Sequence, residues 1–381
     1  MTRAPVYLDH NATTPLKPAV VAAVAAALGC TGNPSSVHRF GRCARRQVED
    51  ARTAVAALVG ARPAQVIFTA SATEANNLAV RGLTPLRHVL MSAIEHDSVV
   101  GAVEEAERVP VSDAGVIDLA ALEWALTRDA RPALVAVMLA NNETGAIQPV
   151  AEAARIAHAH GALLLCDAAQ AAGKITVDMA ALGCDLLTIS AHKLGGPQGA
   201  AALVVADRVM LAPLTRGGGQ ERGRRAGTEN VAAIAGFGVA AKLAAEDLPR
   251  LAALAPWRDR LEAALHNMAP VQVFGAEAPR MPNTSCVTMP GVGAETQIMA
   301  LDLAGVAVSA GAACSSGKVR ASRVLTAMGV APAVAGTAIR VSLGWSTTEA
   351  DVDRFIETWT GLWSRLGIRA VGAARAAAPA A

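Results

Sequence analysis

Short apolar runs alternate with longer alanine-rich segments through the first two thirds of this chain. Because the runs are apolar on both faces, they are typical of parallel strands that are covered by helices on both sides. We therefore expect an α/β fold with a mostly parallel central sheet. The predicted strands are Val66–Thr69, His88–Ser92, Leu134–Leu139, Ala162–Cys166, Leu186–Ile189 and Ala202–Val205.

The composition of the chain changes after the helical stretch Val231–Ala245, where prolines become frequent. With 381 residues, it has the length of two domains of about 150 residues or more. We expect a large domain over 15–250, a smaller α+β domain formed by 1–14 and 251–368, and a disordered low-complexity tail over 369–381. The smaller domain has predicted strands at Thr284–Met289, Val306–Ser309 and Ala338–Leu343, and a helix from Glu349 to Leu366.

Composition excludes several classes of protein. Hydrophobic residues make up 52% and charged residues 17%, which excludes a disordered chain. The apolar stretch Ala19–Cys30 is shorter than the roughly 18 to 20 residues that span a bilayer, and Asp9 and His10 stand where a secretory signal needs apolar residues. We expect a cytoplasmic protein. The net charge of +2 favours neither nucleic acid nor a membrane surface as a partner.

The six cysteines are scattered without a C-x-x-C pair, which indicates reduced thiols. His158 and His160 lie two residues apart with no other ligand at suitable spacing, so no metal site is expected. Five of the cysteines are interpreted as inert buried residues: Cys30, Cys43, Cys166, Cys184 and Cys286.

A carboxylate and a lysine follow two of the predicted strands. Asp167 comes directly after Ala162–Cys166, and Lys193 follows Leu186–Ile189. Ligands of such sheets bind beyond the carboxyl ends of the strands. A carboxylate that keeps a ring nitrogen protonated and a lysine that forms a Schiff base are what pyridoxal 5'-phosphate (PLP) requires. Taken singly, each residue is more simply a helix cap or a solvated loop residue; the pair favours PLP.

A third strand end is suited to an anion. Val66–Thr69 runs into Ala70-Ser71-Ala72-Thr73-Glu74, where small residues open a helix and let backbone N–H groups approach a phosphate. The simpler alternative is an ordinary Ser/Thr helix cap.

Nine segments in order make the chain resemble the cysteine desulfurases, in particular those of the nitrogen-fixation type, which are PLP enzymes of the class V aminotransferase family. The resemblance covers nearly the whole chain and implies fold type I of the PLP-dependent transferases. The segments are 7–15, 32–38, 68–76, Glu95-His96, 140–145, 167–170, 190–193, 217–230 and 309–317.

The resemblance also implies roles for individual residues. Lys193 would bind PLP covalently, Asp167 would pair with its ring nitrogen, and His96 would stack on the ring and move protons. Gln170 and Asn142 would lie near the ring hydroxyl, and Arg340 and Asn142 would bind the substrate carboxylate. The phosphate would be held by Ala72, Thr73, Ser190, His192 and, from the neighbouring subunit of a homodimer, Thr228.

In the family, a cysteine at the position of Cys314 attacks the sulfur of L-cysteine, which leaves a persulfide and L-alanine. The implied role is to supply sulfur to an acceptor protein, such as a scaffold for iron–sulfur cluster assembly, including that for nitrogen fixation. Two segments depart from the family pattern. Ala70-Ser71 replaces the common Ser-Gly, and the cysteine loop reads Ser309-Ala-Gly-Ala-Ala-Cys314.

Other interpretations stay open. Selenocysteine lyases, cysteine sulfinate desulfinases and aminotransferases share the PLP features, and for them Cys314 would be dispensable. A scaffold with a lapsed PLP site is disfavoured because Lys193, Asp167, His96 and Arg340 are all present. The G-x-G-x-x-A pattern at 236–241 lies inside a helical stretch, so we interpret it as helix packing rather than dinucleotide binding.

Overall fold

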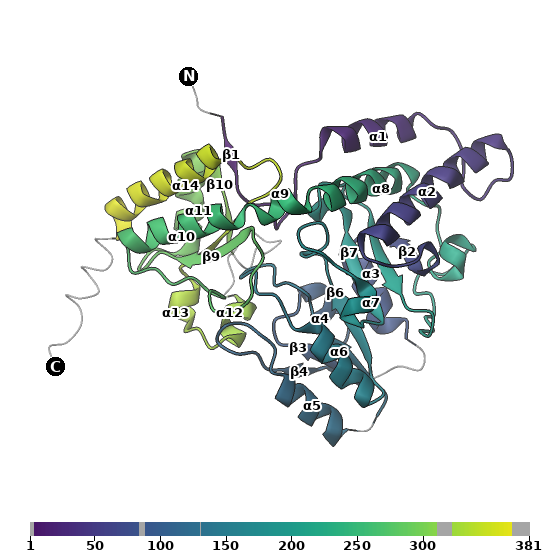
Figure 1. Ribbon diagram of the computed structural model, residues 1–381, viewed down its shortest axis with the longest axis horizontal. Helices are drawn as coiled ribbons and strands as arrows, with labels where there is room; N and C mark the ends of the chain where they lie inside the picture. The colour runs from purple at the N-terminus through teal and green to yellow at the C-terminus, as the bar shows by residue number, and fades with distance from the viewer. Residues whose placement is uncertain (1–3, 84–87, 130, 311–321, 368–381) are drawn as a thin grey trace.

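A seven-stranded sheet forms the centre of the larger part of the molecule, in the order β2-β8-β7-β6-β5-β3-β4 (Figure 1). The computed structural model describes residues 4–83, 88–129, 131–310 and 322–367. All pairings from β4 through β3, β5 and β6 to β7 are parallel, which confirms a mostly parallel sheet. The strands are β2 (Val66–Thr69), β3 (His88–Ser92), β4 (Glu107–Val109), β5 (Ala133–Ala136), β6 (Leu163–Asp167), β7 (Leu186–Ser190) and β8 (Ala201–Val205).

The direction of β8 differs from the expectation. The run Ala202–Val205 was expected to be parallel, but β8 is antiparallel to both of its neighbours, β7 and β2. Residues 191–200 are the only link between β7 and β8, which is shorter than the dozen or more residues of a parallel crossover. The strand expected over Leu134–Leu139 ends as β5 at Ala136, and β4 was not predicted because its charged residues hide the apolar pattern.

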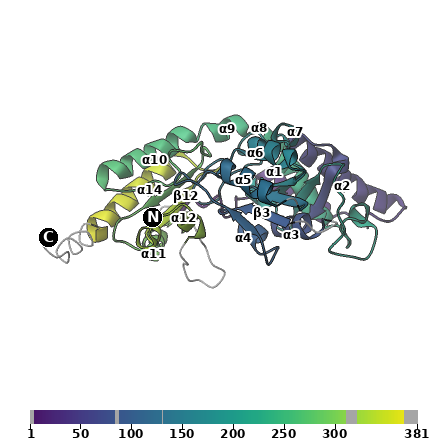
Figure 2. The same ribbon diagram turned by 90° about the horizontal axis from the view of Figure 1, so that it is seen from below.

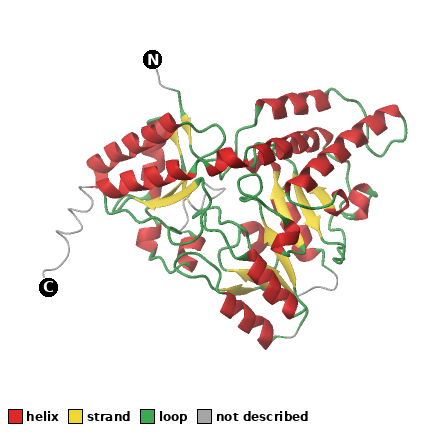
Figure 3. Ribbon diagram, viewed as in Figure 1, coloured by secondary structure: helices red, strands yellow, loops and turns green. Residues whose placement is uncertain are grey.

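Successive strand residues point to opposite faces of the sheet, and helices cover both faces (Figure 3). Phe68 and Leu90 pack into a cluster with α1, α2 and α5 to α8, whereas Ile67 and Val89 pack into a cluster with α3 and α4. In the described ranges, no helix combines the length and the apolar character needed to span a membrane. The helices of this part are α1 (Pro18–Leu28), α2 (Arg39–Leu58), α3 (Ala72–Arg81), α4 (Asp97–Val100), α5 (Leu119–Arg128), α6 (Val150–Ala159), α7 (Met179–Leu182) and α8 (Val231–Glu246), with short 3-10 turns η1 (Pro63–Gln65), η2 (Ala191–Lys193) and η3 (Gln220–Gly223).

The G-x-G-x-x-A pattern lies within α8 and contacts two other helices. A Cβ on Gly236 would lie 2.5 Å from Cγ2 of Val24 in α1, and a Cβ on Gly238 would lie 2.7 Å from Cβ of Ala51 in α2. Neither distance leaves room for a side chain. The interpretation of this pattern as helix packing is therefore confirmed.

The remaining elements form a second part of the molecule at the end opposite to α2 (Figure 2). It contains an antiparallel sheet of order β11-β12-β9 and a parallel pair, β1 with β10. The strand expected over Val306–Ser309 divides between these two sheets, and the helix expected to reach Leu366 changes to π-helical turns at Trp363. The elements are β1 (Val6–Tyr7), β9 (Thr284–Thr288), β10 (Val306–Ala307), β11 (Ser309–Ala310), β12 (Ala338–Ser342), α9 (Leu248–Ala252), α10 (Ala255–Met268), α11 (Ala294–Leu303), α12 (Arg323–Ala327), α13 (Pro332–Ala335), α14 (Glu349–Leu362) and η4 (Trp363–Gly367).

The start of the chain packs with its last third. Val6 and Leu8 share a buried cluster with Leu261 and Trp359. This separate cluster supports the predicted small domain, whose boundaries stay a prediction.

Cysteines in the described ranges are free thiols, but not all of them are buried. Cys166, Cys184 and Cys286 are buried as expected, whereas the burial expected for Cys30 and Cys43 is wrong. Cys30 follows the end of α1, and Cys43 lies on the outward face of α2. Among the residues described, no group of three or more His, Cys, Asp and Glu side chains is arranged to hold a metal.

Candidate active site

A cavity of about 590 Å³ opens at the carboxyl ends of the parallel strands, between the large sheet and β12. It collects side chains that follow β2, β3, β6 and β7, as expected for this class of sheet. A wider surface groove of about 860 Å³ lies between α10 and α13 and contains none of the predicted site residues. The predicted residues that line the first cavity are Ala72, Thr73, His96, Asn142, Asp167, Gln170, His192, Lys193 and Arg340.

Lys193 lies at the end of η2, directly after β7. Its Nζ donates to the backbone carbonyl oxygens of Asn11, at 2.5 Å, and Ala12, at 2.9 Å. Burial, followed by the positive charge of Arg340, lowers the pKa of Lys193 to about 8. A larger share of this lysine is therefore the nucleophilic free amine near neutral pH than for an exposed lysine.

Asp167 is the last residue of β6, and its side chain is held on both oxygens. The residue is 6% exposed. Its Oδ2 accepts a hydrogen bond of 2.8 Å from Nδ2 of Asn76, and its Oδ1 accepts one of 2.9 Å from the backbone N–H of Ala169. The carboxylate is thus fixed at the cavity wall. Asn76 was not singled out from the sequence, although an asparagine inside a helix is a signal of a specific polar contact.

His96 caps the short helix α4 with its ring. Nδ1 accepts a hydrogen bond of 3.1 Å from the backbone N–H of Ser98 and lies 2.8 Å from Oγ of Ser98. That hydroxyl in turn accepts a hydrogen bond of 2.8 Å from Asn76, which also holds Asp167. Because Nδ1 is occupied as an acceptor, Nε2 is the ring nitrogen that can exchange a proton with a bound molecule.

A smaller cavity of about 430 Å³ adjoins the first and shares Ala12, Ser71 and His192 with it. Ser190, the last residue of β7, lines this second cavity, and its buried Oγ has no hydrogen-bond partner in the described structure. An unpaired buried hydroxyl is costly unless a ligand meets it. Burial, followed by the charge of Lys193, lowers the pKa of His192 to about 4, so its ring is neutral at physiological pH.

The start of α3 closes the same end of the site. The helix cap is Ser71, whose Oγ accepts a hydrogen bond of 3.1 Å from the backbone N–H of Glu74. The alternative of a simple helix cap therefore holds for Ser71, while Thr73 remains exposed at the cavity. Arg225 forms an ion pair of 2.8 Å with Glu74, which offsets a negative charge beside a potential anion site.

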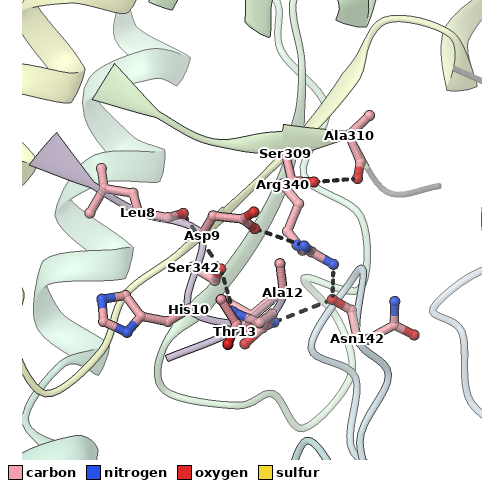
Figure 4. A network of polar contacts seen from close by, with 12 residues as sticks. Leu8, Asp9, His10, Ala12, Thr13, Asn142, Ser309, Ala310, Arg340 and Ser342 are labelled. Atoms are coloured by element: carbon pink, nitrogen blue, oxygen red, sulfur yellow. Dashed lines mark hydrogen bonds and ion pairs between the residues drawn. The ribbon is translucent and has the colours of Figure 1, made fainter. Parts of the chain in front are cut away.

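Arg340 brings a guanidinium group into the cavity from β12 (Figure 4). Its Nη2 contacts Oδ1 of Asp9 at 2.8 Å, and its Nη1 donates to the backbone carbonyl of Asn142 at 3.1 Å. Its buried Nε has no partner within the described ranges. The amide side chain of Asn142 takes no part in this network. Arg340 thus retains donor capacity for a carboxylate, in competition with Asp9.

Asn11 and Lys174, which were not predicted as site residues, organise the space beside Lys193 together with the predicted Gln170. Gln170 Nε2 donates to the backbone carbonyl of Asn11 at 2.9 Å, and Gln170 Oε1 accepts from Nζ of Lys174 at 2.9 Å. Asn11 lies in the first matching segment, yet nothing in its local pattern indicates a contact with residues so distant in the chain.

Glu95, in the cavity wall, was also not predicted as a site residue. It is 1% exposed, and its Oε1 accepts a hydrogen bond of 2.6 Å from the backbone N–H of Met138. Burial raises the pKa of Glu95 to about 8, and the nearby Asp167 adds to this shift. Glu95 is therefore predominantly a neutral acid at pH 7.

Of the remaining predicted site residues, one lies apart from the two adjoining cavities and one falls outside the described residues. Thr228 lines a separate cavity of about 120 Å³ together with Thr69 and Glu221. Cys314 lies outside the described residues. The chain on either side of 311–321 is described: Ser309 pairs with Arg340, and Arg323 lines the active-site cavity.

The donor set in the two adjoining cavities fits PLP. A lysine amine and a fixed carboxylate lie at one sheet edge, and the unpaired hydroxyl of Ser190 lies beside the start of α3. The first pair suits an aldehyde and a ring nitrogen, and the second suits a phosphate.

Comparisons with known proteins agree with this arrangement. Residues 6–355 match the family model described as aminotransferase class-V. A cysteine desulfurase of Enterobacter agglomerans is 41% identical over 375 residues, which cover 95% of this chain and 93% of that protein.

Solved structures also match this chain over nearly its whole length. The NifS-like protein from Rickettsia africae ESF-5 superposes with a TM-score of 0.88 at 34% identity, covering 94% of this chain and 99% of that one. A structure of SspA in complex with cysteine superposes with a TM-score of 0.76 at 28% identity, covering 89% of this chain and 98% of that one. The chain belongs to the class V aminotransferase family.

Proposed function

We propose that this chain is a PLP-dependent cysteine desulfurase, which converts L-cysteine into L-alanine and transfers the sulfur to an enzyme cysteine as a persulfide. The observation that carries the proposal is that Lys193, Asp167 and Arg340 line one cavity. A lysine amine, a ring-nitrogen partner and a carboxylate ligand are the groups that PLP chemistry on an amino acid requires. The related cysteine desulfurase and the structure in complex with cysteine support the choice of reaction.

The chain's own residues have distinct tasks in this proposal. PLP, when bound, supplies an electron sink for the charge that develops on the substrate. Lys193 provides the amine that binds the cofactor, and Asp167 keeps the ring nitrogen protonated. His96 would stack on the PLP ring and move a proton through Nε2. Arg340 binds the substrate carboxylate through charge-assisted hydrogen bonds.

Other predicted residues complete the site. Ser190, His192, Ala72 and Thr73 bind the phosphate, a role supported for Ser190 by its unpaired buried hydroxyl. The side-chain amides of Gln170 and Asn142 would contact the ring hydroxyl and the substrate. These residues line the two adjoining cavities.

Cys314 is the proposed sulfur acceptor on the enzyme. Its thiolate sulfur attacks the sulfur of L-cysteine, so an S–S bond forms and the C–S bond of the substrate breaks. The electron pair of the broken bond stays with the substrate carbon, and a proton then completes alanine. Ser309 and Arg323 flank the segment that contains Cys314. Ser309 pairs with Arg340 of the cavity wall and Arg323 lines the cavity, which supports the proposal.

We further propose a cytoplasmic homodimer in which Thr228 completes the phosphate site of the neighbouring subunit. The free thiols of the described cysteines are consistent with a reducing compartment. The separate position of Thr228 in its own chain supports a role across the interface. Sedimentation of the PLP-loaded protein tests the dimer, and a monomer would contradict it.

The persulfide sulfur goes to an acceptor protein for iron–sulfur cluster assembly, in the general or the nitrogen-fixation pathway.

The direct test adds L-cysteine to the PLP-loaded protein while visible absorbance and alanine are followed together. We expect the absorbance of bound PLP to change as alanine accumulates. The K193A variant should show no such change in absorbance and form no alanine. A change in absorbance without alanine would point to another class V reaction, such as transamination. A wild-type protein that takes up no PLP would contradict the proposal as a whole.

A further inference from the structure

Lys174 is a buried lysine that lies behind the active-site cavity. It is 5% exposed and follows Gly173, whose φ of +75° and contact with Ala244 require a glycine. A Cβ on Gly173 would lie 2.8 Å from Cβ of Ala244 in α8. This tight turn, packed against α8, precedes a lysine whose side chain is buried.

The amine of Lys174 contacts two side-chain amides. Nζ donates to Oδ1 of Asn11 at 2.8 Å and to Oε1 of Gln170 at 2.9 Å. Within the described ranges, no carboxylate forms an ion pair with it. Burial, followed by the charges of Lys193 and Arg340, lowers the pKa of Lys174 well below its ordinary value.

These two hydrogen bonds act together with others that set the direction of each amide: Oδ1 of Asn11 also accepts from Nδ2 of Asn283 at 3.2 Å, and Nε2 of Gln170 is itself bonded. A lysine amine bonded in this way donates, so the oxygen of each amide must face it and the nitrogen must face away. Gln170 Nε2 accordingly donates to the backbone carbonyl of Asn11 at 2.9 Å and lies at the cavity wall. The same carbonyl accepts a hydrogen bond of 2.5 Å from Nζ of Lys193.

Asn11 is fixed from its other side as well. Its Nδ2 donates to Oγ1 of Thr284 at 2.9 Å and to the carbonyl of Asn142 at 3.2 Å. Asn11 therefore links Lys174, Lys193 and the second part of the molecule in one network.

We propose that Lys174 is a positioning residue of the PLP site: its two hydrogen bonds orient Asn11 and Gln170, so that Gln170 presents an N–H group to the ring hydroxyl of PLP and Asn11 directs the amine of Lys193. This inference rests on the proposed roles of Lys193 and Gln170. Without Lys174, the Gln170 amide keeps only the hydrogen bond from Nε2 to the Asn11 carbonyl, and its N–H group is held less firmly toward the ring oxygen. A negatively charged ring oxygen would then lose part of this donor and would hold the neighbouring proton of bound PLP more tightly.

The test compares K174M with K242M, a matched change of an exposed lysine on α8. Visible absorbance of bound PLP is titrated with pH in the absence of L-cysteine. We expect the K174M midpoint to rise by about one pH unit, the size of one lost hydrogen bond to a charged group. The midpoint of K242M should equal that of the wild type. With L-cysteine, kcat of K174M should fall about tenfold with little change in KM, because Arg340 is untouched.

An unchanged titration midpoint in folded K174M would overturn the inference, as would an equal change in K242M. If K174M does not fold, as judged by circular dichroism, K174Q provides a shorter donor and is titrated in its place, with a smaller rise expected. The titration needs no turnover. A wild type that binds PLP but makes no alanine would therefore contradict the proposed reaction while leaving the role of Lys174 open to the same measurement.

Discussion

Ionisable side chains around Lys193 are buried, and burial favours their uncharged forms. The pKa of His192 is lowered to about 4 and that of Lys193 to about 8, whereas the pKa of Glu95 is raised to about 8. His192 and Glu95 are therefore largely uncharged near neutral pH. His192 and Glu95 thus add little charge to that of Asp167, Arg340, the cofactor and the substrate.

Glu95 gives a prediction on stability against pH. Between its ordinary pKa of 4.5 and about 8, the unfolded chain has lost the Glu95 proton while the folded chain keeps it. The wild-type protein therefore loses stability as the pH rises through this window. E95Q has no proton to release and retains the acceptor for Met138. We expect the free energy of unfolding of E95Q, relative to that of the wild type, to increase by roughly 1.4 kcal/mol per pH unit in this window.

Urea unfolding of the apoproteins across this pH range measures the difference. E123Q, which changes an exposed glutamate on α5, is the matched control and should stay parallel to the wild type. A constant difference between E95Q and the wild type would show that the Glu95 proton does not contribute to folding.

Some residues of the candidate site could be predicted from the sequence and others could not. Lys193 and Asp167 were predictable because each closes an apolar run, and parallel strands end at the same sheet edge. Asn11 and Lys174 were not, because their contact joins positions 163 residues apart. Glu95 lies in a matching segment, but its proton affinity depends on Met138, which follows β5, and on Asp167, the last residue of β6.

At the scale of elements, α8 packs closely against α1 and α2. Because a Cβ on Gly238 of α8 would lie 2.6 Å from the Cα of Ala51 in α2, G238A forces α8 and α2 apart. We expect a loss of about 1 to 3 kcal/mol in the free energy of unfolding, the usual cost of overpacking.

The matched control is G361A in α14, where no described atom beyond the local helix backbone lies within 4 Å of the new methyl group. There, alanine should stabilise the protein by about 0.5 kcal/mol through helix propensity. Thermal and urea unfolding measure both variants. Equal effects at the two positions would contradict the packing role of Gly238.

The elements themselves were largely visible in the sequence. Apolar runs located six strands of the large sheet, and small residues located the packing of α8. The antiparallel direction of β8 was not visible, because an apolar run has no direction and only the short link from β7 determines it. Similarly, β10 and β11 form one apolar run that the fold divides between two sheets.

At the scale of the whole molecule, the proposed active site unites distant parts of the chain. Asp9 and Asn11 come from the first residues, Lys193 follows β7 of the large sheet, and Arg340 lies in β12. Ser309 pairs directly with Arg340. The segment that contains Cys314 therefore starts beside the proposed substrate carboxylate site, which is where a sulfur acceptor is needed.

The most direct measurement of the central claim is the comparison of C314A with the wild type after a single addition of L-cysteine. Alanine is quantified, and the intact protein is weighed for one added sulfur atom. Wild-type protein should form alanine and gain sulfur on Cys314, whereas C314A should bind PLP normally but form neither product. C30A, which removes an exposed thiol, should behave as the wild type. Alanine formation by C314A at the wild-type rate would contradict the account.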